Sequence, residues 1–291
     1  MLHLTNGDTA ARLIRRIGVS GTVIAWRDVL HEGPVPANLS LEGMSDVRAR
    51  FAVSCRWGTL PDISASLGAR DAALRSARRV ILWFEHDLYD QLQLLQILDT
   101  LAAQRDSSAE LICVNVFPGV EPFHGLGQLS AAQIATLWPN RRPVTPAQLA
   151  LGQRAWKAFC SRNTAALPDF LRGDLSPLPF LRAALERLLE EFPAAPTGLS
   201  RTDRQILTAV AAGCQDFDSL FLACEQQESA PFMGDAVFEL HLKCLIEART
   251  PLLNPSPLTL TTAGQRVLAG DLDAGELNGI NRWIGGVHLV R

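Results

Sequence analysis

Two short apolar runs, VILWF at Val80–Phe84 and LICVNVF at Leu111–Phe117, constrain the fold of this chain most strongly. Each has the length of a strand and stays apolar, without the alternation of a strand that has one wet face. A helical pattern with leucines along one face separates them at Leu88–Ala102. Strands that are apolar throughout and separated by helices are typical of a parallel sheet with both faces covered.

The chain before these runs adds two further strands, Leu2–Thr5 and Thr22–Trp26. Helical spacing follows the first strand until Gly18, a residue type that commonly ends helices. The sequence therefore predicts an α/β fold with a four-stranded, mostly parallel, Rossmann-like sheet in residues 1–120. Further helices are expected at 41–57 and 61–77.

The remainder divides into two parts. Residues 121–198 lack strand signals, and capping boxes at Ser130 and Thr145 mark helix starts. A Pro-rich segment at 193–198 predicts a linker. Residues 199–291 show three helices followed by a hairpin and a further helix capped at Thr262, the order of a winged-helix-like domain. The predicted divisions are thus an α/β ligand-binding domain, a helical extension and a winged-helix-like domain.

Composition narrows the class of protein. The 47% hydrophobic and 20% charged content is that of an ordinary globular chain, and the net charge of −3 offers no general attraction to nucleic acid. No apolar run reaches the ~20 residues of a membrane helix. The N-terminus lacks a signal-peptide layout, and the six cysteines form no C-x-x-C. We expect a cytoplasmic protein with reduced cysteines and no membrane or nucleic-acid partner.

Polar residues follow three of the predicted strands. In an open parallel sheet, ligands bind beyond the carboxyl ends of the strands, near the point where strand order reverses. If the order is 2-1-3-4, the three polar segments meet at one edge, with the crevice between strands one and three. The segments are Asn6-Gly7-Asp8, Asp28 with His31-Glu32-Gly33-Pro34, and Glu85-His86-Asp87 with Asp90 and Gln91.

Several of these residues have a purely structural alternative. Asp8 or Thr9 would cap the first helix, and Asp87 would cap the helix that follows it. Capping leaves Glu85 and His86 unexplained, so we favour a functional interpretation there. His3 is interpreted as a hydrogen-bonded core histidine. Trp26 and Trp83 are likewise interpreted as core residues.

Two chemistries suit this set of side chains. A histidine with a carboxylate behind it works as an acid or base near neutral pH, and the same groups could hold a divalent metal. No H-x-H or H-E-x-x-H spacing favours the metal, so acid–base work or binding without metal ranks first. The candidate catalytic residues are His31, His86, Glu85 and Asp28. The candidate ligand-binding residues are Asn6, Gly7, Asp8, Glu32, Gly33, Asp87, Asp90 and Gln91.

Nucleotide-binding signals are weak. The sequence has no P-loop and no G-x-S-x-G. Gly125-Leu-Gly127 precedes the helix start at Ser130, a place where an anion could be held, but no third glycine follows in the G-x-G-x-x-G spacing.

The last part of the chain is acidic. Residues 199–291 hold seven lysine and arginine residues against eleven aspartate and glutamate residues. Phosphate neutralisation needs the opposite balance, so we favour a domain that packs on or covers the α/β part over DNA binding. The Gly-rich tail Asn278–Leu289 either returns towards the predicted site or serves as a hydrophobic anchor.

The segments LHLTNGDTAA, WRDVLHEGPVP and LWFEHDLYDQLQLLQ resemble the bacterial family called domain of unknown function 1835. The region LPFLRAALERLLEEFP…GLSRTDRQIL and the ending NRWIGGVHL look like its usual C-terminal companion, so the resemblance covers nearly the whole chain. It implies a bacterial cytosolic protein and names no substrate. It also implies that Asp8, Asp28, Gly33 and Pro34 are shared scaffold and that the histidines are a subgroup's chemistry.

The leading prediction is an enzyme, hydrolase- or transferase-like, acting on a small polar ligand that is phosphorylated or nucleotide-like. The alternatives are a ligand-responsive winged-helix transcriptional regulator and a non-catalytic interaction module.

Overall fold

The computed structural model describes residues 1–104 and 106–291. The chain divides into two compact units, which are described separately. Unit 1 comprises Met1–Leu185 and Gly285–Val287, and unit 2 comprises Glu186–Ile284 and His288–Arg291.

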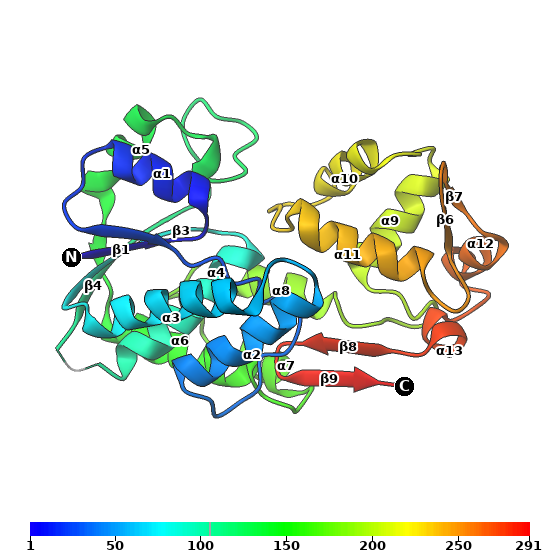
Figure 1. Ribbon diagram of the computed structural model, residues 1–291, viewed down its shortest axis with the longest axis horizontal. Coiled ribbons are helices and arrows are strands. Elements are labelled where there is room, and N and C mark those ends of the chain that lie inside the picture. The colour runs from blue at the N-terminus through cyan, green and yellow to red at the C-terminus, as the bar shows by residue number, and fades with distance from the viewer. Residues whose placement is uncertain (105) are drawn as a thin grey trace. The chain divides into compact units, whose positions relative to one another are not determined.

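A five-stranded sheet of order β2-β1-β3-β4-β5 forms the centre of unit 1 (Figure 1). The first four strands pair in parallel, and β5 pairs antiparallel with β4. The first four strands therefore have the 2-1-3-4 order that was assumed for the sequence. The strands are β1 (Leu2–Thr5), β2 (Thr22–Ala25), β3 (Arg79–Glu85), β4 (Ser108–Val114) and β5 (Arg142–Pro143).

The prediction of four strands is wrong by one edge strand. The additional strand, β5, has two exposed residues, Arg142 and Pro143, which pair with Leu111 and Glu110 of β4. A strand this short has no apolar run from which it could be predicted, and proline is tolerated in strands mainly at such edges.

The buried strand pattern is confirmed for β3, where every residue after Arg79 is buried. The fourth strand differs from the expected 111–117, because pairing with β3 sets its register. Arg79 pairs with Ser108 and Glu85 with Val114, so β4 begins three residues earlier and ends before Asn115.

Helices cover both faces of this sheet. Figure 1 shows α1 and α5 on one face and α3, α4 and α6 on the other. Apolar side chains of α1, of α5 and of the sheet pack into one core cluster. It includes Ile14, Ile81, Trp83 and Ile134. The bounds are α1 (Asp8–Arg16), α2 (Leu41–Ser54), α3 (Leu60–Ser76), α4 (Leu88–Ala102), α5 (Ala131–Leu137), α6 (Pro146–Phe159), α7 (Ala166–Leu171) and α8 (Leu181–Leu189), with 3-10 turns η1 (Leu126–Gln128) and η2 (Trp138–Asn140).

Most of the expected helix starts are confirmed. Ser130 and Thr145 each form a complete capping box. The first helix is an exception: α1 begins after Gly7, with Asp8 as its first helical residue and no side-chain cap. Capping by Asp8 or Thr9 was therefore wrong, and the Asp8 carboxylate pairs with Arg27 instead.

Unit 2 contains three helices, a hairpin and a further helix packed on one apolar cluster that includes Ile206, Leu220, Phe238 and Val267. The α12 cap is Thr261, whose Oγ1 accepts from Gly264 N at 3.0 Å, rather than the adjacent Thr262. The bounds are α9 (Arg201–Ala211), α10 (Phe217–Glu225), α11 (Asp235–Ile246), β6 (Leu253–Pro255), β7 (Leu258–Leu260), α12 (Thr262–Ala269), α13 (Ala274–Asn278), β8 (Asn281–Ile284) and β9 (Val287–Val290).

Part of the Gly-rich tail belongs to unit 1. Gly285 O accepts from Val35 N, and Gly286 N donates to Phe159 O, each at 2.9 Å. A Cβ at Gly286 would lie 1.9 Å from Cys160 O, which explains a glycine there. All six cysteines carry free thiols. Among the described residues, no helix combines the length and apolarity needed to cross a membrane.

Candidate functional site

Three buried carboxylates meet where β3 gives way to α4. Glu85 ends β3, Asp87 is the N-cap of α4, and Asp90 lies in its first turn. One carboxylate oxygen from each lies within 4.8 Å of the others, and the three residues are no more than 5% exposed. Asp87 does cap the helix, accepting from Asp90 N at 3.0 Å, and it belongs to this cluster as well. We call Glu85, Asp87 and Asp90 the acidic centre.

Asn6 ties the end of β1 to the acidic centre. Its Nδ2 donates to Glu85 Oε1 at 3.1 Å and to Asp90 Oδ2 at 2.8 Å. Its Oδ1 accepts from Gly7 N at 2.6 Å, which fixes the amide orientation. Because β1 pairs with both β2 and β3, strand order reverses between β1 and β3. The acidic centre therefore lies at the switch point where open parallel sheets bind ligands.

The start of η1 also contacts Glu85. Leu126 N donates to Glu85 Oε1 at 2.7 Å. A Cβ at Gly125, whose φ is 137°, would lie 2.0 Å from Glu85 Oε2. The Gly125-Leu-Gly127 segment, considered as a weak anion site, thus contacts a carboxyl group of the chain itself. The Leu126 amide was missed, and the glycine was the signal that could have revealed it.

Burial and mutual repulsion raise the pKa values of this cluster. Burial, followed by the Asp87 charge, raises the pKa of Glu85 to about 8, although Leu126 and Asn6 oppose the shift. Burial raises the pKa of Asp87 to about 7. Burial and the charges of Asp87 and Glu85 raise the pKa of Asp90 well above its usual value. Such a cluster holds protons at neutral pH unless a cation is present to balance it.

The acidic centre has the chemistry of a hard-cation site. Carboxylate oxygens are the ligands preferred by Mg²⁺, Ca²⁺ and Mn²⁺, and Glu85, Asp87 and Asp90 could hold such an ion. Equally, carboxyl groups with pKa values near 7 are suited to give or take a proton in catalysis.

Asp28 lies in a different kind of cluster. Arg48 Nε donates to Asp28 Oδ1 at 2.8 Å, and Arg70 Nη1 lies 3.9 Å from Oδ2. Arg70 also pairs with Asp71, and all four side chains are at least 96% buried. We call Asp28, Arg48, Arg70 and Asp71 the arginine network. In this network each buried charge has a partner of opposite sign. The contacts hold the loop after β2 against α2 and α3.

The arginines of this network were missed by sequence reasoning, although the sequence holds a signal for them. In α3, the buried positions Leu67, Arg70, Asp71 and Leu74 form one stripe. Charged residues at core positions of a helical stripe indicate a buried ion pair, because a lone buried charge is too costly.

The loop after β2 is held by backbone contacts. Arg48 Nη1 donates to Glu32 O at 2.7 Å and to Pro34 O at 3.3 Å. Gly33 has a φ of 75°, and a Cβ there would lie 2.6 Å from the Phe51 ring. These contacts give Gly33 and the Pro34 carbonyl a structural role in holding the loop.

The two candidate histidines have different neighbours. His31 is buried, with its ring edge-on to Tyr89 at 6.0 Å between centroids. His86 is partly buried and lies edge-on to Phe180 at 6.0 Å. Burial lowers the pKa of His86, partly offset by a hydrogen bond to the Val114 backbone. Within the described residues, His86 Nδ1 has no hydrogen-bond partner.

The remaining candidates take supporting positions. Asp8 is exposed and paired with Arg27, away from the hydrogen bonds of the acidic centre. Gln91 Nε2 donates to Glu85 O at 2.7 Å and thereby fixes the strand end. His3, confirmed as a core residue, is fully buried, with Nδ1 accepting from Trp83 Nε1 at 3.1 Å. Trp26 and Trp83 are confirmed as core residues too.

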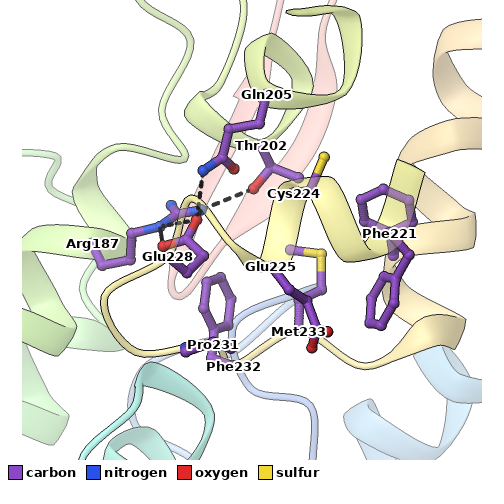
Figure 2. Close-up of a pocket in the computed structure, with 11 residues that line it drawn as sticks. Arg187, Thr202, Gln205, Phe221, Cys224, Glu225, Glu228, Pro231, Phe232 and Met233 are labelled. Carbon is purple, nitrogen blue, oxygen red and sulfur yellow. Dashed lines mark hydrogen bonds and ion pairs between the residues drawn. The ribbon is translucent and has the colours of Figure 1, made fainter. Parts of the chain in front are cut away.

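A pocket lies in unit 2 (Figure 2). Its apolar wall includes Phe221, Phe232 and Met233. Arg187 bonds Glu228 through both Nε and Nη2, and Gln205 donates to the same carboxylate at 2.9 Å. Arg187 and Glu228, two of the charged residues that line this pocket, therefore pair with each other.

No protein-family model and no curated protein matches the chain. The functional argument therefore rests on its own residues.

Proposed function

We propose that this chain is an enzyme that binds a small polar ligand at the carboxyl ends of its parallel strands and uses the acidic centre for its chemistry. One observation carries the proposal. Asn6 bonds Glu85 and Asp90 across the β1–β3 switch point, where three buried carboxylates converge and no cationic side chain is bonded to them among the described residues.

The lack of a cationic partner among the described residues supports a functional role for these carboxylates over a purely structural one. Elsewhere in unit 1, buried Asp28 and Asp71 are paired with arginines, as stability requires. Leaving three carboxylates together without such a partner costs stability, and such costs are concentrated at functional sites. The ligand must supply what the centre lacks, which is a positive charge or hydrogen-bond donors.

The reaction class follows from what carboxyl groups do. Glu85 and Asp87 would exchange protons as acid and base, or the acidic centre would hold a divalent metal that polarises the ligand. Both routes serve hydrolysis or group transfer. Acid–base roles for His31 and His86 remain part of the proposal, with His86 the nearer in sequence to the acidic centre.

The test is retention of ions and ligands by purified protein. Native mass spectrometry detects a co-purifying metabolite, and equilibrium dialysis against Mg²⁺, Mn²⁺ or Ca²⁺ followed by metal analysis detects an ion. We expect one of these in stoichiometric amount for the wild type and a loss in Asp87→Asn. Asparagine is as good an N-cap as aspartate, so this variant removes charge while keeping the start of α4.

Asp216→Asn is the matched control. Asp216 caps α10 as Asp87 caps α4, accepting from Ser219 N at 2.9 Å, but it is exposed. It should leave retention unchanged. A wild-type protein that retains neither ion nor metabolite would refute the proposed enzyme and favour a non-catalytic interaction module.

The second candidate function is a ligand-responsive transcriptional regulator. The order α9, α10, α11, hairpin β6–β7 and α12 supports a winged-helix-like arrangement of unit 2. Its exposed α11 residues include Asp235 and Glu239, which would repel phosphate. Absence of a mobility shift with duplex DNA at low salt would remove this candidate. Membership of the family called domain of unknown function 1835 stays a prediction.

A further inference from the structure

The C-terminal tail contributes one short segment to unit 1, Gly285–Val287, which we call the strap. The residues on either side of it, Ile284 and His288, belong to unit 2. The tail strands β8 and β9 form a two-stranded sheet of their own, separate from the five-stranded sheet. The position of the strap in unit 1 therefore depends on local contacts rather than on pairing with a strand of that unit.

One peptide group of the strap bonds two different parts of unit 1. Gly285 O accepts from Val35 N, in the loop after β2, and Gly286 N donates to Phe159 O, each at 2.9 Å. Phe159 is the last residue of α6, and the last four carbonyls of a helix lack an intrahelical donor. The Gly285–Gly286 peptide group thus supplies an acceptor to the loop and a donor to the end of α6.

The strap backbone lies directly on the end of α6. A Cβ at Gly286 would lie 1.9 Å from Cys160 O. At Gly285, where φ is 56°, a Cβ would lie 2.4 Å from Phe159 O and 2.7 Å from the Phe159 ring. The strap therefore covers a buried aromatic ring, and a side chain at either glycine would push it away from the helix.

The loop after β2 has a second attachment that does not involve the strap. Arg48 donates to the carbonyl oxygens of Val29, Glu32 and Pro34, and it also bonds the Asp28 carboxylate. Segments held by few contacts open at a lower free energy than the core of a domain. Val35, whose amide is bonded by the strap, is therefore the part of this loop that should open first.

We propose that the strap is a conformational device that detaches from unit 1 in a single step, releasing Val35 and the end of α6 together while the sheet stays folded. The C=O and N–H of one peptide group are held in a rigid plane, so displacing this group breaks both hydrogen bonds at once. Detachment frees the end of the loop after β2 and uncovers the Phe159 ring. It does not depend on what the acidic centre binds.

Native-state hydrogen exchange of the wild-type protein tests the single step. Amide exchange is followed by nuclear magnetic resonance at low urea concentrations and corrected for intrinsic rates. We expect the Val35 and Gly286 amides to open with equal frequency, at least about tenfold more often than the Leu82 amide in β3. Unequal opening of Val35 and Gly286 would overturn the proposal. So would opening of both only together with Leu82, because that is unfolding of the whole unit.

The variant Gly286→Ala supplies the second arm. Its methyl group should displace the strap, so exchange at Val35 and at residue 286 should both rise about tenfold or more, with Leu82 unchanged. Gly68→Ala is the control, since Gly68 is exposed in α3 and nothing lies within 4 Å of an added Cβ. Faster exchange at residue 286 alone would show that the two contacts are independent. If Gly286→Ala does not fold, the wild-type comparison still decides.

Discussion

Glu85 in unit 1 and Glu191 in unit 2 are both buried, at 4% and 1% exposed. Their pKa values are nevertheless shifted in opposite directions. Burial opposes the ionised form of Glu191, but Arg282, His241 and Arg187 outweigh it and hold the pKa well below its usual range. Burial and the neighbouring Asp87 carboxylate raise the pKa of Glu85, and the amide donors Leu126 and Asn6 do not outweigh them. Burial alone therefore does not set the direction of the pKa shift, whereas the presence of cationic partners does.

The arginine network shows the same difference between carboxylates with and without cationic partners within unit 1. Asp28 and Glu85 follow two strands of the same sheet, and the sequence made both of them catalytic candidates. Two arginines balance Asp28, while none is bonded to Glu85 among the described residues. The contrast predicts opposite responses when a carboxylate of each kind is neutralised.

The largest expected effect is at Glu191. Its carboxylate accepts from Arg187 at 2.7 Å, from Arg282 at 3.0 Å and from Thr202 at 2.5 Å. Glu191→Gln leaves buried positive charge unbalanced, so the free energy of unfolding in urea should fall by about 3–5 kcal/mol. The neighbouring Glu190 is exposed, and Glu190→Gln should cost less than about 1 kcal/mol. Equal losses for the two variants would contradict the comparison.

Next in size is Gly125→Ala. The new Cβ would lie 2.0 Å from Glu85 Oε2 at a φ of 137°, so the loop must move away from the carboxylate. We expect a loss of about 2–3 kcal/mol in unfolding free energy, and weaker ion retention. Gly119→Ala isolates the backbone cost, since φ is 79° there and nothing lies within 4 Å of the added atom. That control should lose only about 1 kcal/mol.

The pH dependence of stability gives the third prediction. The folded pKa of Glu85, about 8, and that of Asp87, about 7, lie above the ordinary values of 4.5 and 3.8. The native state thus binds more protons than the unfolded state between these limits, and stability falls as pH rises. In EDTA, the free energy of unfolding should therefore decrease from pH 5 to pH 8.

Glu85→Gln should flatten that slope. Glutamine keeps an oxygen for the Asn6 and Leu126 donors and cannot ionise, so the variant should be more stable than the wild type at pH 8 and similar at pH 5. This sign is the reverse of that expected at Glu191. A Glu85→Gln protein less stable than the wild type at pH 8 would mean that Glu85 has a cationic partner after all.

The parallel strands and the polar residues at their ends could be predicted from local patterns, whereas the 2-1-3-4 order was an assumption. Apolar runs such as Val80–Phe84 identify buried strands, and parallel strands bring their carboxyl ends to one edge. The edge strand β5 could not be predicted, since two residues carry no periodicity. Nor could the pairing of Asp28 with Arg48 and Arg70, which lie 20 and 42 positions along the chain, because charge pairing depends on tertiary contacts.

The smallest expected effect is that of Asp8→Ala, which tests whether Asp8 acts together with the acidic centre. Asp8 follows the same strand as Asn6 and was a candidate for the same role, but it is 60% exposed and pairs with Arg27 at the surface. Exposed ion pairs contribute little, so Asp8→Ala should change the unfolding free energy by less than about 1 kcal/mol, part of it from the dipole of α1. Retention of ions in dialysis should be unchanged, whereas Asn6→Ala should reduce it, because Asn6 bonds both Glu85 and Asp90. If Asp8→Ala reduces retention as much as Asn6→Ala does, exposed carboxylates at this strand end take part in binding, and lack of a cationic partner is not what distinguishes the site.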